Sequence, residues 1–491
     1  MKRLIFLSAI LSLAAVVFTS DSVSGQNRQT LFSLKESPQA KSVPEKSSIA
    51  SVRESEINFN SLSAGESTRL RFPLFDGKIY EANRVESETR TADDYTWRGK
   101  LVEGKFSGDV SLTFKKGFVS GLIYAPNAVY EIVPRGDKQI LVELNQTLFP
   151  ECAGNVKGDQ TKNNRRTENA LAGVDSGDKI DVLVLYTTPV KNSLGGDAQA
   201  QAFAQQAIDI SNTTYLNSKI RQRLRLVNAR ETAIAETGSL GSELPVLRAD
   251  TTGAALRDQY KADLVAMISN SSDNCGIGYL MGTAAGGNSN NAFTVTSRSC
   301  AVGNLSFPHE LGHNMGSAHN PENGSGGTYP YSFGHWINGS YRTVMSYVDQ
   351  CTSGCTRHPY FSNPSIVFMN AATGTELRDN ARSINNTADS IANYRYSGTS
   401  LTLTGYNGGE WIPRYISRAV TWSSDNLTGN VKIEVSRDET TSWETLIAST
   451  ANDGSEIINV PGRATRHARI RVSSIDNANV SDSSVNNILI K

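Results

Sequence analysis

Short runs of alternating apolar and polar residues fill the stretch from about Ile57 to Leu148. Val110–Phe114 and Ile140–Leu144 are two of these runs, and turn residues punctuate the stretch. Because successive side chains of a strand point to opposite faces, this pattern predicts antiparallel β-structure. The polar residues 26–60, which contain few aromatics, predict a mobile lead-in.

A different pattern begins after the polar stretch 153–179. A continuous apolar run at 181–186 predicts a buried strand, and residues 224–227 and 263–268 predict two more strands. Between the first two, Phe203, Ala207 and Ile210 fall on one face of a predicted helix, and Asp197 is its expected N-cap. Strands that alternate with helices predict an α/β unit.

Two further stretches predict strands. Residues 292–296, around Phe293, follow a Gly- and Asn-rich stretch and predict a short edge strand that pairs with an extended peptide. After about Ser397, alternating runs at 431–435 and 469–472 are separated by turn residues and predict a small β-sandwich.

The first residues carry a targeting pattern. Lys2 and Arg3 precede an apolar run from Leu4 to Phe18, and small residues follow up to Gly25. This order predicts a secretory signal peptide. The alternative, a membrane-spanning helix, needs about 20 apolar residues, and the run is short for that. We therefore expect a secreted protein without a membrane partner.

The balance of basic and acidic residues bears on whether the protein binds nucleic acid. Lys+Arg and Asp+Glu are equal at 48 each, so no basic surplus favours nucleic acid.

The stretch from Phe307 to His319 carries the candidate chemistry. A helix would place His309 and His313 one turn apart on the same face. Gly316 can adopt positive φ and turn the chain so that His319 returns as a third ligand. Three protein ligands with an open fourth position are typical of catalytic zinc.

Glu310 stands next to the first of these histidines, within reach of a metal-bound water. Such a water has a pKa near 7, and Glu310 is the candidate general base that takes its proton. The alternative is a helix with three structural histidines. The extended spacing, with a glycine and a third histidine, favours the metal site.

The motif resembles that of the metzincin zinc metalloendopeptidases, in which a methionine turn follows the histidines. Met345 matches that methionine, and the resemblance implies an apolar floor beneath the metal. Tyr347 matches a tyrosine that lies near the zinc in astacin-like and serralysin-like members. It would donate a hydrogen bond to a developing oxyanion, and a packed tyrosine is the alternative.

Within the metzincins, residues 179–397 are most similar to the reprolysin-like group and to bacterial peptidyl-Asp metalloendopeptidases. The matching stretches of sequence include Cys275–Leu280, Arg342–Tyr347 and Tyr360–Pro364. The resemblance implies a zincin-like fold, one catalytic zinc ion and protein or peptide substrates. Asn320 departs from it, because many members have Asp there as local structural support. Nothing in the sequence supports a calcium ion.

Five cysteines in a secreted chain leave one over after pairing. The simplest pairs are Cys275 with Cys300 and Cys351 with Cys355, which leaves Cys152. Its setting resembles the zymogens of related families, in which a cysteine occupies the fourth zinc position and proteolysis releases it. Cys152 is therefore the candidate latency thiol, with cleavage expected near Arg166. A spare thiol or a different pairing remains the alternative.

The remaining histidines and the C-terminal tryptophans have ordinary interpretations. We expect His335 to pack in an aromatic loop, and His358 and His467 to be structural or on the surface. The tryptophans of the predicted sandwich are expected in its core.

We predict a multidomain protein made as a zymogen. Its segments are a signal peptide at 1–25, a β-rich pro-segment at 26–166, a metzincin-like α/β zinc protease domain at 167–397 and a β-sandwich at 398–491. The predicted protein is a monomer that cuts internal peptide bonds of extracellular proteins. An adhesin that acts through its C-terminal module and a zinc amidase for cell-wall peptides are the alternatives.

Overall fold

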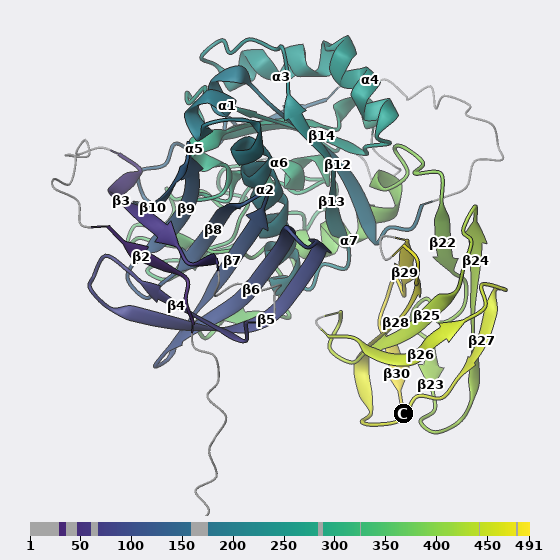
Figure 1. The fold of residues 1–491 in the computed structure, drawn as a ribbon. Coiled ribbons are helices and arrows are strands. Elements are labelled where there is room, and N and C mark those ends of the chain that lie inside the picture. Colours follow the sequence, from purple (N-terminus) through teal and green to yellow (C-terminus); the bar gives the residue numbers. More distant parts are fainter. Residues whose placement is uncertain are drawn as a thin grey trace, which may run out of the picture.

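The chain forms three groups of β-sheets, and most of its helices surround the middle group (Figure 1). This computed structural model describes residues 29–35, 47–59, 67–158, 175–282, 288–324, 326–440, 442–477 and 480–491. The expected signal peptide and the Arg165–Arg166 pair lie outside these residues. In the described part of the chain, no helix is both long and apolar enough to cross a membrane.

The first group is one ten-stranded sheet, here called the N-terminal sheet. In spatial order its strands are β1 (Gln29–Thr30), β4 (Arg69–Pro73), β5 (Ile79–Thr91), β6 (Asp94–Glu103), β7 (Phe106–Lys115), β8 (Phe118–Tyr124), β9 (Val129–Arg135), β10 (Lys138–Leu144), β3 (Ile49–Ile57) and β2 (Phe32–Leu34).

The alternating runs predicted antiparallel β-structure correctly, since all neighbours except the pair β1 and β4 are antiparallel. The prediction of a mobile lead-in is wrong where the chain is described. Residues 49–57 pair with β10 along most of their length, because backbone hydrogen bonds do not require apolar side chains.

The second group is a six-stranded central sheet. In spatial order its strands are β11 (Asn155–Lys157), β15 (Gly276–Leu280), β16 (Phe293–Ser297), β14 (Leu264–Ser269), β12 (Lys179–Tyr186) and β13 (Arg223–Glu231). Its helices are α1 (Thr188–Leu194), α2 (Asp197–Asn217), α3 (Leu240–Ala249), α4 (Thr251–Gln259), α5 (Arg298–Ala301), α6 (Ser306–Asn314) and α7 (Asn380–Ile391), with a short 3-10 turn at Ser289–Asn291.

The three runs form the predicted strands β12, β13 and β14, which are parallel to one another. β12 and β14 are buried, whereas β13 lies at the end of the sheet and is mostly only partly buried. The prediction of an edge strand at Phe293 is wrong, because β16 lies between β14 and β15. The strand outside it is β15, which is antiparallel to β16 and pairs in parallel with β11. The Gly- and Asn-rich sequence before residue 292 does not reveal which strand of the sheet lies outermost.

Helix α2 forms where predicted, but its N-cap is Gly196 rather than Asp197. The Asp197 carboxylate instead accepts a hydrogen bond from the Tyr186 hydroxyl, at 2.8 Å. The helix lies against strands β7 and β8 of the N-terminal sheet as well as against β13 (Figure 1). Its residues are therefore buried on all sides, from Gln199 onward for most of its length.

The histidine-bearing part of the chain contains small sheets and two disulfides. The sheets comprise β17 (Trp336–Ile337), β18 (Tyr341–Arg342) and β19 (Thr356–Arg357), and a hairpin of β20 (Val367–Phe368) and β21 (Ala371–Ala372). The pairs Cys275–Cys300 and Cys351–Cys355 form as predicted, and Cys152 is free and buried.

The third group consists of two sheets over a shared apolar core that includes Val420, Ile433 and Val472. One sheet contains β22 (Ser400–Leu403), β24 (Arg418–Asp425) and β27 (Ser455–Ile458). The other contains β23 (Trp411–Ile412), β30 (Ile488–Ile490), β28 (Thr465–Ser474), β25 (Val431–Ser436) and β26 (Glu444–Thr450), with β29 (Ser481–Ser483) beside β28.

The expectation that the tryptophans fill this core holds for only one of them. Trp422 is buried, whereas Trp411 is 54% exposed and Trp443 lies under the guanidinium of Arg471. A cation over an indole face stabilises a surface tryptophan without burying it in a core.

A buried carboxylate joins the N-terminal sheet to helix α2. Asp209 is fully buried and accepts hydrogen bonds from Arg90 at 3.3 Å and from the hydroxyls of Thr96 and Thr113. Those three partners lie on β5, β6 and β7. The polar residues of β7 thus face a helix rather than water, and the interface depends on one desolvated charge with its partners.

Replacing Asp209 with Ala should destabilise the unprocessed chain by about 3 kcal/mol, because Arg90 loses a buried anionic partner. Urea unfolding would measure the loss. Asp197→Ala is the matched control, since Asp197 lies on the same helix but bonds within the central unit. Equal losses from both substitutions would contradict this role for Asp209.

Candidate metal centre and catalytic site

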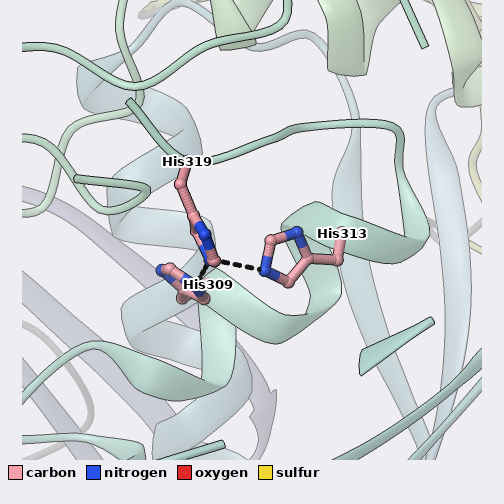
Figure 2. Close-up of side chains that lie close together, drawn as sticks. All are labelled: His309, His313 and His319. Atoms are coloured by element: carbon pink, nitrogen blue, oxygen red, sulfur yellow. Dashed lines mark hydrogen bonds between the residues drawn. The ribbon is translucent and has the colours of Figure 1, made fainter. Parts of the chain in front are cut away.

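Helix α6 presents His309 and His313 on one face, one turn apart, as their spacing predicts. Hydrogen bonding continues to Met315, and the chain then turns at Gly316, where φ is +89°. Residues with a Cβ rarely adopt that angle, so glycine suits the turn. The chain returns to bring His319 against the other two imidazoles (Figure 2).

The three imidazoles converge through the same ring nitrogen. The Nε2 atom of His319 lies 3.1 Å from the Nε2 atoms of both His309 and His313. The Nδ1 atom of His309 donates to the carbonyl of Val344 at 2.8 Å, and that of His313 donates to the carbonyl of Ser317 at 2.8 Å. In the neutral rings, the Nε2 lone pairs of His309 and His313 are therefore free and point at a common position.

Burial keeps these rings neutral. It lowers the pKa of His313 to about 4 and the pKa values of His309 and His319 well below the usual range. Neutral imidazoles with converging lone pairs fit a metal cation, and a carbonyl on the opposite nitrogen is the usual support for a histidine ligand. The three residues predicted from the sequence thus form a possible metal site.

Glu310 lies beside this cluster and is fully buried. Neither carboxylate oxygen has a well-formed hydrogen bond within the described part of the chain. Burial raises the pKa of Glu310 to about 8, and the Cys152 thiol and the Arg357 charge oppose part of that rise. A buried carboxylate whose oxygens lack well-formed hydrogen bonds is costly, and such groups are common among catalytic residues.

The backbone of β15 passes very close to this carboxylate. A Cβ atom on Gly276 would lie 2.4 Å from Oε1 of Glu310. Glycine is therefore required for the observed contact, and it fixes where the carboxylate lies relative to the sheet.

A segment from the end of the N-terminal sheet crosses the centre. The sulfur of Cys152 belongs to one cluster with His309 and Glu310, whose ligand atoms all lie within 4.8 Å of one another. Ala153 donates to the carbonyl of Gly276 at 2.9 Å, and β11 continues the pairing with β15. Burial and the nearby Glu310 carboxylate raise the pKa of Cys152.

Met345 and Tyr347 both lie close to the histidines. Met345 is fully buried, and a Cβ on Gly312, between the two helix histidines, would lie 2.9 Å from its sulfur. The Tyr347 ring lies 4.3 Å from that of His319, and its hydroxyl donates to the carbonyl of Cys152 at 2.9 Å.

Asn320 supplies local support of the kind that the family's aspartate would give. Its side-chain oxygen accepts a hydrogen bond from the backbone nitrogen of Tyr347 at 3.1 Å, and its amide donates to Glu322 and Asn323. The other histidines lie outside the cluster: His358 is buried against Tyr124, whereas His467 pairs with Glu439 at the surface. His335 is only partly buried in its aromatic loop.

Three residues near the centre were not predicted from the sequence: Glu151, Arg342 and Arg357. Glu151 precedes Cys152, and both arginines are buried, at 1% and 0% exposure. Both arginines lie on two-residue strands. Arg342 begins the matching stretch Arg342–Tyr347 but had no predicted role, and no motif includes Arg357. Only the adjacency of Glu151 to the candidate thiol was visible in the sequence.

Comparison with known proteins agrees with this geometry. Residues 176–362 match the family model Reprolysin_5, described as metallo-peptidase family M12. A protein named peptidyl-Asp metalloendopeptidase from Xanthomonas campestris pv. campestris is 29% identical over 345 residues, which is 65% of this chain and 80% of that protein. A protein of the same name from Stenotrophomonas maltophilia is 30% identical over 293 residues, 56% of this chain and 68% of that protein.

A solved structure titled "Structure of a chaperone-substrate complex" aligns with a TM-score of 0.37 and 21% identity, covering 58% of this chain and 39% of that one. At that score, the likeness carries no argument. The site and the family match together define a metallopeptidase. The chain belongs to the M12 metallopeptidases, and it is a metalloendopeptidase.

Gly276→Ala should lower kcat/KM for peptide hydrolysis by about 100-fold or more, because the added methyl group displaces the candidate general base Glu310 and general-base catalysis contributes at least that factor. Peptide hydrolysis would measure the loss, and circular dichroism would check folding. Gly241→Ala is the control, since its nearest neighbour would be 3.7 Å away. Unchanged hydrolysis by a folded Gly276→Ala enzyme would contradict the required close approach.

Proposed function

We propose that this metalloendopeptidase is secreted, uses a single zinc ion and is made as a zymogen that Cys152 keeps latent. The observation that carries the proposal is the cluster of the Cys152 sulfur with His309 and Glu310. It combines a nitrogen-rich metal site, a buried carboxylate and a thiol supplied by a separate part of the chain. The proposed substrates are extracellular proteins, cut at internal peptide bonds.

His309, His313 and His319 are the proposed zinc ligands. A bound zinc ion would supply a nucleophile at neutral pH and polarise the scissile carbonyl. The Glu310 carboxylate takes a proton from the attacking water and passes it to the leaving amine. The Tyr347 hydroxyl, freed from the Cys152 carbonyl, can donate to the substrate oxyanion, and Met345 packs beneath the histidines.

The latent state rests on the segment that carries Cys152. A thiolate is a good zinc ligand and excludes the catalytic water when it binds in its place. The backbone pairing with β15 keeps the thiol at the centre and also blocks a strand edge that a peptide would use. We propose that cleavage near Arg166 allows this segment to leave.

Two features support secretion and substrate choice. The disulfides Cys275–Cys300 and Cys351–Cys355 suit an oxidising compartment, as does the expected signal peptide at 1–25. The relatives carry the name peptidyl-Asp metalloendopeptidase. We propose that this chain also cuts beside aspartate.

Glu310→Gln should reduce cleavage of casein by the processed enzyme by about 10²–10⁴-fold, because the general base is lost. Zinc content, measured by atomic absorption, should stay at that of the wild type, since all three histidines remain. Glu243→Gln is the matched control, because Glu243 is also fully buried but bonds to Thr237 and Ser271. Wild-type cleavage by Glu310→Gln would refute the assignment.

Cys152→Ser in the unprocessed chain should raise peptide hydrolysis about tenfold or more, equivalent to the loss of about 1.4 kcal/mol of inhibitory binding. Hydrolysis would be measured before any cleavage of the linker, as checked by intact mass. The double variant with Glu310→Gln should remain inactive, which excludes a contaminating protease. If the unprocessed Cys152→Ser chain hydrolyses peptide no faster than the unprocessed wild-type chain, the latency role of the thiol is refuted.

A further inference from the structure

Two arginines are buried beside the proposed catalytic centre. Among the residues that the structure describes, neither forms an ion pair with a carboxylate of the predicted protease domain at 167–397. Arg342 and Arg357 are register partners on β18 and β19, and both donate to the carbonyl of Ser346, at 2.8 and 3.2 Å. Arg357 also donates to the carbonyl of Asn304 at 2.9 Å. The Nε atoms of both arginines have no hydrogen-bond partner within the described residues. Two adjacent buried cations are costly, so their retention calls for an anion.

That anion comes from the segment that covers the centre. Within the described residues, the one ion pair of Arg357 is with Glu151, whose Oε2 atom lies 3.6 Å from Nη2. The other oxygen, Oε1, accepts a hydrogen bond from the backbone nitrogen of Val348 at 2.8 Å. The Val348 backbone N–H thus binds one carboxylate oxygen, and the Arg357 guanidinium lies near the other oxygen as an ion pair without a hydrogen bond. A cation and a backbone donor on either side of a carboxylate favour an acidic side chain at this position.

The position of this carboxylate relates it to the reaction. Glu151 immediately precedes Cys152, whose sulfur lies with His309 and Glu310. The backbone carbonyl of Glu151 accepts from the nitrogen of Cys275, just before β15, so the residue is held at the strand edge. The site for the carboxylate therefore lies one residue away from the group that faces the metal centre.

We propose that Arg357, with Arg342 behind it and the Val348 N–H beside it, forms the pocket that binds the carboxylate of an acidic substrate residue next to the scissile bond. The proposal rests on the function proposed above and deepens it by naming the residues that select the substrate. In the unprocessed chain, Glu151 fills this pocket as a built-in mimic of the acidic residue. After the segment leaves, the pocket is open to an aspartate of a substrate protein.

Matched peptides that differ only by Asp or Asn at one position would test the pocket. With enzyme processed from the full chain, kcat/KM for the Asp peptide should exceed kcat/KM for the matched Asn peptide. In Arg357→Gln this ratio should fall about tenfold or more, because the charge-assisted contact is lost. Arg357→Lys should retain part of the ratio, since it keeps a charge but loses the planar fork.

Arg257→Gln is the control for loss of a buried guanidinium. Arg257 also donates to backbone carbonyls, those of Ala262 and Ser289, but lies on α4. Its substitution should leave the Asp-to-Asn ratio at the wild-type value. An Asp preference that survives in Arg357→Gln, or a wild-type enzyme that cuts both peptides equally, would overturn the inference. A processed wild-type enzyme that cuts no peptide would instead overturn the proposed function.

A second measurement does not depend on the folding of an arginine variant. Two synthetic peptides with the sequence of residues 148–157, both with Ser in place of Cys152, would carry either Glu or Gln at position 151. The Glu peptide should inhibit the processed wild-type enzyme about tenfold more strongly, because only it carries the charge that Arg357 binds. Equal inhibition by the two peptides would overturn the pocket assignment.

Discussion

The pairing of residues 155–157 with the edge of β15 is the constraint on which the rest of the site depends. An exposed sheet edge offers unpaired N–H and carbonyl groups to any extended peptide. Here the chain's own segment takes that edge, and Ala153 and Glu151 extend the contact across the start of β15. In the zymogen proposed above, a substrate would need the same backbone groups, so latency and substrate binding would compete for a single edge.

This covering strand also sets the electrostatics of the centre. Glu310, Cys152 and Arg357 are all buried, and burial raises the pKa values of the Glu310 carboxyl and the Cys152 thiol. Those shifts belong to the covered state, because part of the burial comes from the segment itself. In the proposed activation, departure of the segment would expose the same side chains to solvent and substrate, and Arg357 would lose the nearby anion Glu151.

Local patterns in the sequence predicted the features that depend on short spacings. The histidine helix, the turn at Gly316 and both disulfides were predicted because periodicity and chain connectivity determine which residues are close. The edge position of β15 and the arginine pair were not predicted, since both depend on contacts between distant segments. Helix α2 shows the same limit: its apolar face was correct, but its polar face is also buried because another sheet covers it.

In the proposed latent state, Glu151 and Cys152 would act as a pair, and their adjacency means that a weak contact would suffice at each. The Arg357 guanidinium lies 3.6 Å from the Glu151 carboxylate, and an ion pair at this separation binds only weakly by itself. Both groups are tethered to a sheet that packs on α2, so their effective concentration at the centre is high and their contributions combine. In the proposed zymogen, a cut in the linker would remove the covalent tether but not the packing around Asp209. Activation would then require this interface to separate, so the buried contact with α2, and not the thiol alone, would determine how fast the enzyme is released.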